Sequence, residues 1–139
     1  AFYQAYISVK DALVASDSVA AANAIKALRP AFTGLQPATL SEGAKAEWDS
    51  RSVALGTVIS SIEQNTGLEQ QRESFSGLSD ETYRLVKAFG LSGTETYYAY
   101  CPMALHDKGA YWLSGEKEIR NPYFGASMMN CGAVREFRH

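Results

Sequence analysis

The chain has 139 residues and a mass of 15.1 kDa, which fits one domain with a hydrophobic core of its own. Hydrophobic residues make up 46% of it and charged residues 20%, a balance that excludes a disordered chain. The formal net charge of -2 shows no electrostatic footprint of nucleic-acid binding, so no nucleic-acid partner is expected.

The sequence also bears on membrane insertion and export. No apolar run approaches the ~18 residues needed to span a bilayer, so we expect no direct membrane insertion. The printed sequence starts at Ala1 rather than Met, and this start is consistent with removal of an export signal. The basic residues near the other end, Arg135, Arg138 and His139, are expected to form a solvated tail.

Apolar residues in the first third of the chain recur every three or four positions, which is typical of the buried face of a helix. In the first predicted helix these residues are Phe2, Tyr6, Val9 and Leu13. Asp17 or Ser18 is expected to cap a second helix, and Pro30 falls near its end. The apolar face of the second helix holds Ala21, Ile25, Leu28 and Phe32. Residues 33–38 are predicted to connect it to the next helix.

Two longer helices are predicted next. Thr39 and Glu42 form a plausible capping box for the third helix, and residues 65–67 break the pattern after it. Its apolar face holds Trp48, Leu55, Ile59 and Ile62. The fourth helix presents Leu68, Phe75, Leu78, Leu85 and Phe89, and is expected to stop at Gly90. Gly77 and Ser79 are positions at which this helix could kink.

Four amphipathic helices with short connections predict an up-and-down four-helix bundle over residues 1–90, so the fold class is mainly all-α. The glutamates of these helices, including Glu63, Glu69 and Glu73, are expected to lie on solvated faces.

Residues 91–139 have a different character, with frequent glycine and five of the eight tyrosines. Residues 96–101 and 110–113 have the composition of strands, and residues 106–109 between them are predicted to turn, with Gly109 at a positive φ. A hairpin this short is not stable alone. We therefore expect one domain over 1–139, in which a small irregular, hairpin-like subdomain packs on the helices. Its aromatic residues (Tyr97, Tyr98, Tyr100 and Trp112) are expected to pack rather than to stack on nucleic-acid bases.

The C-terminal segment holds all the sulfur of the chain. Cys101 and Cys131 are the two cysteines, and each of the three methionines (Met103, Met128 and Met129) lies within three residues of one of them. Thiolate and thioether sulfur are soft ligands that select Cu(I) over Mg²⁺ or Ca²⁺. The two thiolates with one or two thioethers, and His106 as a further ligand, would form a site for Cu(I) or another soft metal ion.

A second interpretation stays open. Two cysteines in an exported domain commonly form a disulfide, and a redox-sensitive pair can also bind metal once it is reduced. Met129 is better explained as a core residue, and His106 is also explained as an exposed turn residue. Enzymatic activity is not expected, because the sequence has no phosphate-binding loop, no HExxH motif and no oriented nucleophile and base.

Several segments resemble one bacterial family. They are Tyr100-Cys101-Pro102-Met103-Ala104, Gly109 to Ser114, Glu118 to Gly125, and Met128 with Cys131-Gly132, joined more weakly by Tyr6 to Asp17 and Gln71 to Gly90. This pattern is similar to an exported domain of unknown function that occurs alone and fused to periplasmic adaptor subunits of heavy-metal efflux pumps, the membrane fusion proteins of the CusB type.

The resemblance implies a periplasmic or envelope location, and Cys101, Met103, Met128 and Cys131 as the metal positions. We therefore expect a Cu(I)-binding accessory domain for metal sequestration, or for delivery to an efflux adaptor or pump. The alternative is a protein–protein interaction domain clamped by a Cys101–Cys131 disulfide, with no metal role.

Overall fold

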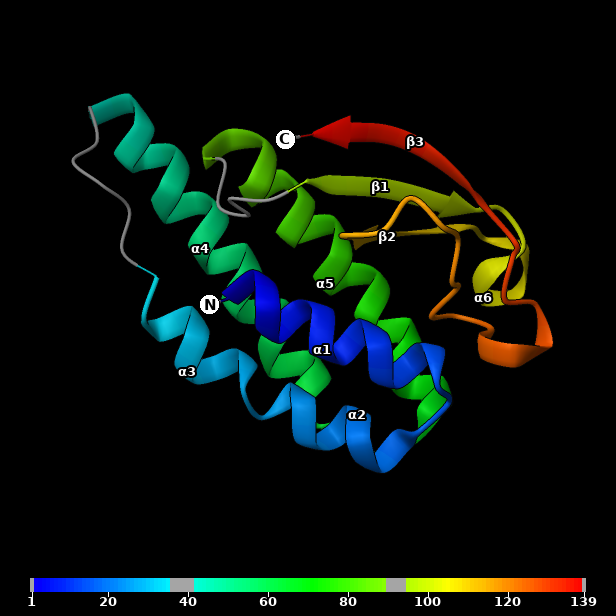
Figure 1. Ribbon diagram of the computed structural model, residues 1–139. Helices are drawn as coiled ribbons and strands as arrows, with labels where there is room; N and C mark the ends of the chain where they lie inside the picture. The colour runs from blue at the N-terminus through cyan, green and yellow to red at the C-terminus, as the bar shows by residue number, and fades with distance from the viewer. Residues whose placement is uncertain (1, 36–41, 90–94, 139) are drawn as a thin grey trace.

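The computed structural model describes residues 2–35, 42–89 and 95–138. Within these ranges the chain is mostly helical, and its C-terminal part forms a small three-stranded antiparallel sheet (Figure 1). The elements are α1 (Phe2–Val14), α2 (Ser18–Ile25), α3 (Leu28–Thr33), α4 (Glu42–Glu63), α5 (Leu68–Phe89), β1 (Thr96–Cys101), α6 (Ala104–Asp107), β2 (Ala110–Ser114), the 3-10 helix η1 (Gly125–Ser127) and β3 (Ala133–Arg138). Helix α5 is central, because it packs against α4 and also against β2 of the sheet.

The predicted apolar faces of the long helices are confirmed. In α1 the four predicted residues are at most 3% exposed. In α4 the inward residues Leu55, Ile59 and Ile62 are fully buried, and in α5 Phe75 and Leu78 are as well. Burial of these faces, rather than helix propensity, is the main source of stability for helices of this kind.

The prediction of one continuous second helix is wrong. Two short helices, α2 and α3, occupy this stretch, and α2 ends at Ile25. Pro30 explains the break, because a proline inside a helix has no N–H to donate to the carbonyl four residues earlier, here that of Lys26, and its ring collides with that carbonyl. The start of α2 is as predicted, since the Asp17 carboxylate accepts a hydrogen bond from the backbone N–H of Ala20 at 2.9 Å.

Helix α5 runs without interruption through Gly77 and Ser79. Thr39 of the predicted capping box and Gly90 of the predicted helix end lie outside the described residues. The up-and-down order of a regular four-helix bundle stays a prediction, because the residues described before the sheet form five helices, of which α2 and α3 are short.

The predicted hairpin is confirmed, but the third strand was missed. Strands β1 and β2 pair antiparallel, with Tyr98 opposite Leu113. Strand β3 pairs with the other edge of β1, which gives the order β2-β1-β3 and a register shift at Tyr98. The basic C-terminal stretch that includes Arg135 is therefore part of the sheet and not a solvated tail. His139 lies outside the described residues.

Aromatic side chains pack the sheet on the helices, as expected. Trp112 is 1% exposed. Tyr98 stacks on Tyr83 of α5 with ring centroids 3.8 Å apart, and on Tyr111 of β2 at 4.6 Å. Burial raises the pKa of Tyr98, and the carboxylate of Asp80 raises it further. These tyrosines are structural contacts between the sheet and α5.

The connection between β1 and β2 is a left-handed turn. Gly109 has φ +83° as predicted, and Leu105, His106 and Asp107 before it also have positive φ. A Cβ atom at Gly109 would lie 2.0 Å from the Tyr100 hydroxyl, so both the backbone conformation and the space require glycine here. This turn lies at one end of the sheet, and it places His106 opposite helix α5.

Candidate functional site

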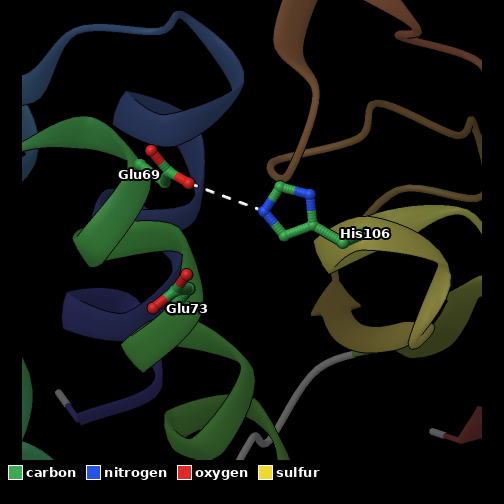
Figure 2. A group of neighbouring side chains, drawn as sticks. All are labelled: Glu69, Glu73 and His106. Carbon is green, nitrogen blue, oxygen red and sulfur yellow. Dashed lines mark ion pairs between the residues drawn. The ribbon is translucent and has the colours of Figure 1, made fainter.

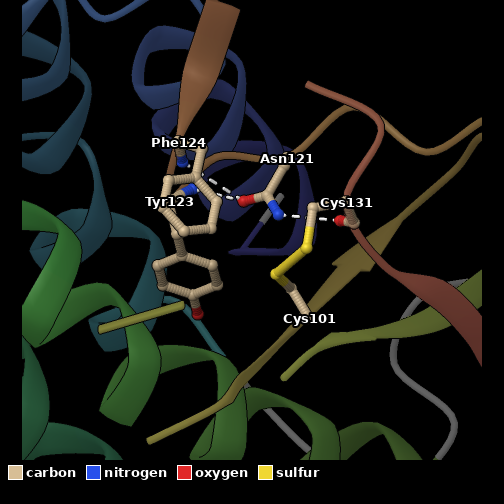
Figure 3. The surroundings of a disulfide bond; sticks show 5 residues. All are labelled: Cys101, Asn121, Tyr123, Phe124 and Cys131. Carbon is tan, nitrogen blue, oxygen red and sulfur yellow. Dashed lines mark hydrogen bonds between the residues drawn. A yellow bond between two sulfur atoms is a disulfide. The ribbon is translucent and has the colours of Figure 1, made fainter. Parts of the chain in front are cut away.

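The two cysteines meet in space and form a disulfide bond (Figure 3). Cys101 ends β1 and Cys131 lies shortly before β3, so the pairing of β1 with β3 brings them together. Their Cα atoms are 5.8 Å apart, inside the usual range for a disulfide. Cys101 is fully buried and Cys131 partly so. The structure therefore contains the disulfide that the second interpretation of the two cysteines predicts.

Asn121 holds the chain before Cys131 in place independently of the disulfide. The side chain of Asn121 is fully buried, and its Nδ2 group donates to the backbone carbonyl of Cys131 at 2.8 Å. Its Oδ1 atom accepts from the backbone N–H groups of Tyr123, at 2.8 Å, and Phe124 (Figure 3). The segment that carries Cys131 is therefore preorganised by hydrogen bonds as well as by a covalent link.

Arg72 of α5 ties the same segment to the helices. Its guanidinium group donates to the backbone carbonyl of Pro122 at 2.8 Å and to that of Leu13, at the end of α1, at 2.9 Å. A further bond reaches the Ser16 hydroxyl at 3.0 Å. Burial lowers the pKa of Arg72, but an arginine in this state remains a cation. One side chain thus joins three parts of the chain that are distant in sequence.

The remaining predicted ligands lie at the surface. The exposed fraction is 48% for Met103, just before α6, and 36% for Met128, just after η1. Met129 is partly buried, which is compatible with the expected packing role. The side chain of His106 is 80% exposed, and its imidazole points toward α5 rather than being buried with Cys101 (Figure 2).

His106 faces a pair of carboxylates that the sequence did not single out. Its Nε2 atom lies 3.6 Å from Oε1 of Glu69, and Glu73 lies one helical turn further along α5 (Figure 2). One ligand atom from each of the three residues lies within 4.8 Å of the other two. Both glutamates are on a solvated face, as expected, but only the fold reveals that this face meets His106.

A pocket of about 410 Å³ lies beside these three residues. Its walls are Leu68, Glu69, Arg72, Glu73, Leu105, His106, Tyr123 and Phe124. Apolar and aromatic walls with a few polar groups are usual for a small-ligand pocket, and this volume lies within the usual range of about 300–1,000 Å³.

Within the described residues, no helix is both long enough and apolar enough to span a bilayer. Searches of the curated proteins and of the solved structures gave no match. A family model, described as a protein of unknown function (DUF3347), matches residues 2–94. That match covers helices α1 to α5 and ends before the disulfide. It also ends before four of the residues that line the pocket, which are Leu105, His106, Tyr123 and Phe124. The chain belongs to the DUF3347 family of proteins of unknown function.

Proposed function

We propose that this chain is a soft-metal binding domain of the bacterial cell envelope, with Cu(I) as its ion and the reduced Cys101 and Cys131 as its thiolate ligands. One observation carries the proposal: the fold brings together two sulfur atoms whose residues lie 30 positions apart. Residues that can reach one another to form a disulfide can also hold a single ion between them when reduced.

The metal-binding form requires reduction of the disulfide. A dithiol reductant would supply two electrons, and two protons would complete two thiols. Cu(I) would then displace one proton from each thiol, and the oxidation state of copper would not change. Two metal–sulfur bonds of about 2.3 Å allow the sulfur atoms to lie about 4 Å apart, a small movement from the bonded state. Cys131 is only partly buried, so an attacking thiolate has an approach to the pair.

Met103 and Met128 are the proposed thioether ligands. Both are partly exposed, and a methionine side chain has three rotatable bonds with which to reach a neighbouring ion. The resemblance of the C-terminal segments described under Sequence analysis, which implies Cys101, Met103, Met128 and Cys131 as metal positions, supports this set. His106 is kept as an additional candidate, although in this structure it engages Glu69.

The proposed role is sequestration, or delivery to a heavy-metal efflux adaptor or pump, without enzymatic activity. Cys101 is fully buried, but Cys131, Met103 and Met128 are at least partly exposed. The thiolates or thioethers of a partner could attack a bound ion from this exposed side, which favours transfer. The link to CusB-type adaptors rests on the resemblance described above.

A second candidate function is favoured by the disulfide itself. Cys101 is fully buried within it, and such a bond suits a permanent clamp of the sheet and the segment 121–132. In that case the chain is a protein–protein interaction domain with no metal role.

A competition titration separates the two functions. The reduced chain is titrated into a colorimetric Cu(I)–chelator complex under argon, and we expect it to remove one Cu(I) per chain. Cys131→Ser should lose this activity and Met128→Leu should weaken it, whereas the adjacent control Met129→Leu should match the wild type. If the reduced wild-type chain leaves the chelator complex intact while Cys131→Ser changes only stability, the clamp is correct and the copper proposal fails.

A further inference from the structure

We propose a second site, in which Glu69, Glu73 and His106 bind a divalent transition-metal ion, with Zn²⁺ as the probe. The site uses no sulfur and lies at the junction of α5 with the turn after β1. It does not depend on the redox state of the cysteines.

The distances between the ligand atoms suit such an ion. Glu69 and Glu73 are four residues apart on α5, so their carboxylates lie on one face of the helix, and His106 approaches that face from α6 (Figure 2). A tetrahedral ion with bonds of about 2.0–2.1 Å holds its donor atoms about 3.4 Å apart. The observed Nε2–Oε1 distance of 3.6 Å for His106 and Glu69 is close to this value, and the whole group lies within 4.8 Å. The exposed side chains of the three residues need to move by only about 1 Å to bring their ligand atoms to the spacing of a tetrahedral site.

The donor atoms select the class of ion. Mg²⁺ and Ca²⁺ prefer all-oxygen sites, whereas one imidazole nitrogen with two carboxylate oxygens suits Zn²⁺, Cu²⁺ and Ni²⁺. The two carboxylates also offset the charge of a divalent ion. Arg72 also lines the cavity, but its N–H groups are directed at the backbone carbonyls of Pro122 and Leu13.

The pocket gives the bound ion room for a further ligand. The three residues form part of the wall of the 410 Å³ cavity, and its other walls include Leu68, Leu105 and aromatic rings. An ion with three protein ligands keeps an open coordination position, which water or a small anionic ligand fills. The cavity is an observation separate from the distances between the ligand atoms, and it supports a binding site at the same three residues.

The test is a calorimetric titration of the oxidised chain with Zn²⁺ in a non-coordinating buffer. With the disulfide intact no thiolate is available, so the result is independent of the copper proposal. We expect saturable binding of one Zn²⁺ per chain. Loss of an outer-shell partner typically costs about 10–100-fold in metal affinity, and loss of a direct ligand should cost no less, so His106→Ala and Glu73→Gln should each weaken binding at least about tenfold.

Glu118→Gln is the matched control, because it removes one exposed carboxylate elsewhere and should change the affinity by less than about twofold. All three proposed ligands are exposed, so these substitutions should leave the thermal unfolding midpoint of the metal-free chain unchanged. Absence of saturable binding by the wild-type chain, or equal affinity in either ligand variant, overturns the site.

Discussion

Replacement of Tyr6 by phenylalanine tests how the sheet is attached to the helices. The Tyr6 hydroxyl is fully buried, accepts a hydrogen bond from the backbone N–H of Leu113 in β2 at 2.9 Å, and lies 2.7 Å from the Ser79 hydroxyl of α5. Burial raises the pKa of Tyr6 well above its ordinary value, so the hydroxyl stays protonated. It joins α1, α5 and the sheet at one atom.

The cost of Tyr6→Phe follows from these contacts. The ring is kept, including its stacking on Phe75 at 5.0 Å, so no cavity forms. Ser79 can turn its hydroxyl to a carbonyl of its own helix, but the Leu113 N–H loses its partner while buried. One unsatisfied buried donor costs about 1–3 kcal/mol, so we expect the free energy of unfolding to fall by about 2 kcal/mol.

Urea unfolding followed by circular dichroism measures this change. With an m-value of about 2 kcal/mol/M, the midpoint should fall by about 1 M while m stays constant. Tyr97→Phe is the control, since Tyr97 is only partly buried, and it should stay within about 0.5 kcal/mol of the wild type. An equally small change in Tyr6→Phe would refute the claim that this hydroxyl secures the sheet.

Three further predictions concern stability, each measured by the same unfolding assay. The double variant Cys101→Ala with Cys131→Ala should lower the free energy of unfolding by about 3.7 kcal/mol, because the unfolded chain gains the entropy of an open loop of about 30 residues. A loss below about 1 kcal/mol would contradict the clamping role. Asp17→Ala should lower the free energy of unfolding by about 1 kcal/mol, because it removes the side-chain cap of α2. Asp17→Asn should keep most of the wild-type stability, because asparagine also caps helices well. Gly109→Ala should lose more than about 2 kcal/mol, because the new methyl group meets the Tyr100 hydroxyl at a positive φ; wild-type stability would show that the turn relaxes without cost.

Local patterns predicted much of the fold. Helical spacing identified the buried faces of α1, α4 and α5, and the composition of residues 96–101 and 110–113 identified the hairpin, because each signal lies within one segment. Strand β3 was missed since Ala133–Arg138 has few large apolar residues, and its pairing partner β1 lies more than thirty residues earlier. The break between α2 and α3 could have been predicted from the sequence, because Pro30 cannot accept a continuous helix that includes Lys26 four residues earlier.

The candidate sites show the same division between local and tertiary information. Clustering of sulfur in the sequence pointed to Cys101 and Cys131, and the fold does bring them together. The approach of His106 to Glu69 could not be read from spacing, because it depends on how the left-handed turn at residues 105–107 is set against α5. Glu69 and Glu73 looked like ordinary solvated residues, and only the tertiary packing distinguishes them.

The central claim is that the reduced cysteine pair is a Cu(I) ligand set. X-ray absorption spectroscopy at the copper edge, on the reduced chain loaded with one equivalent of Cu(I), tests it most directly. Our account predicts a first coordination shell of sulfur at about 2.3 Å that loses sulfur in Cys131→Ser. A shell of nitrogen and oxygen alone, or copper that washes off the reduced wild-type chain, would contradict it.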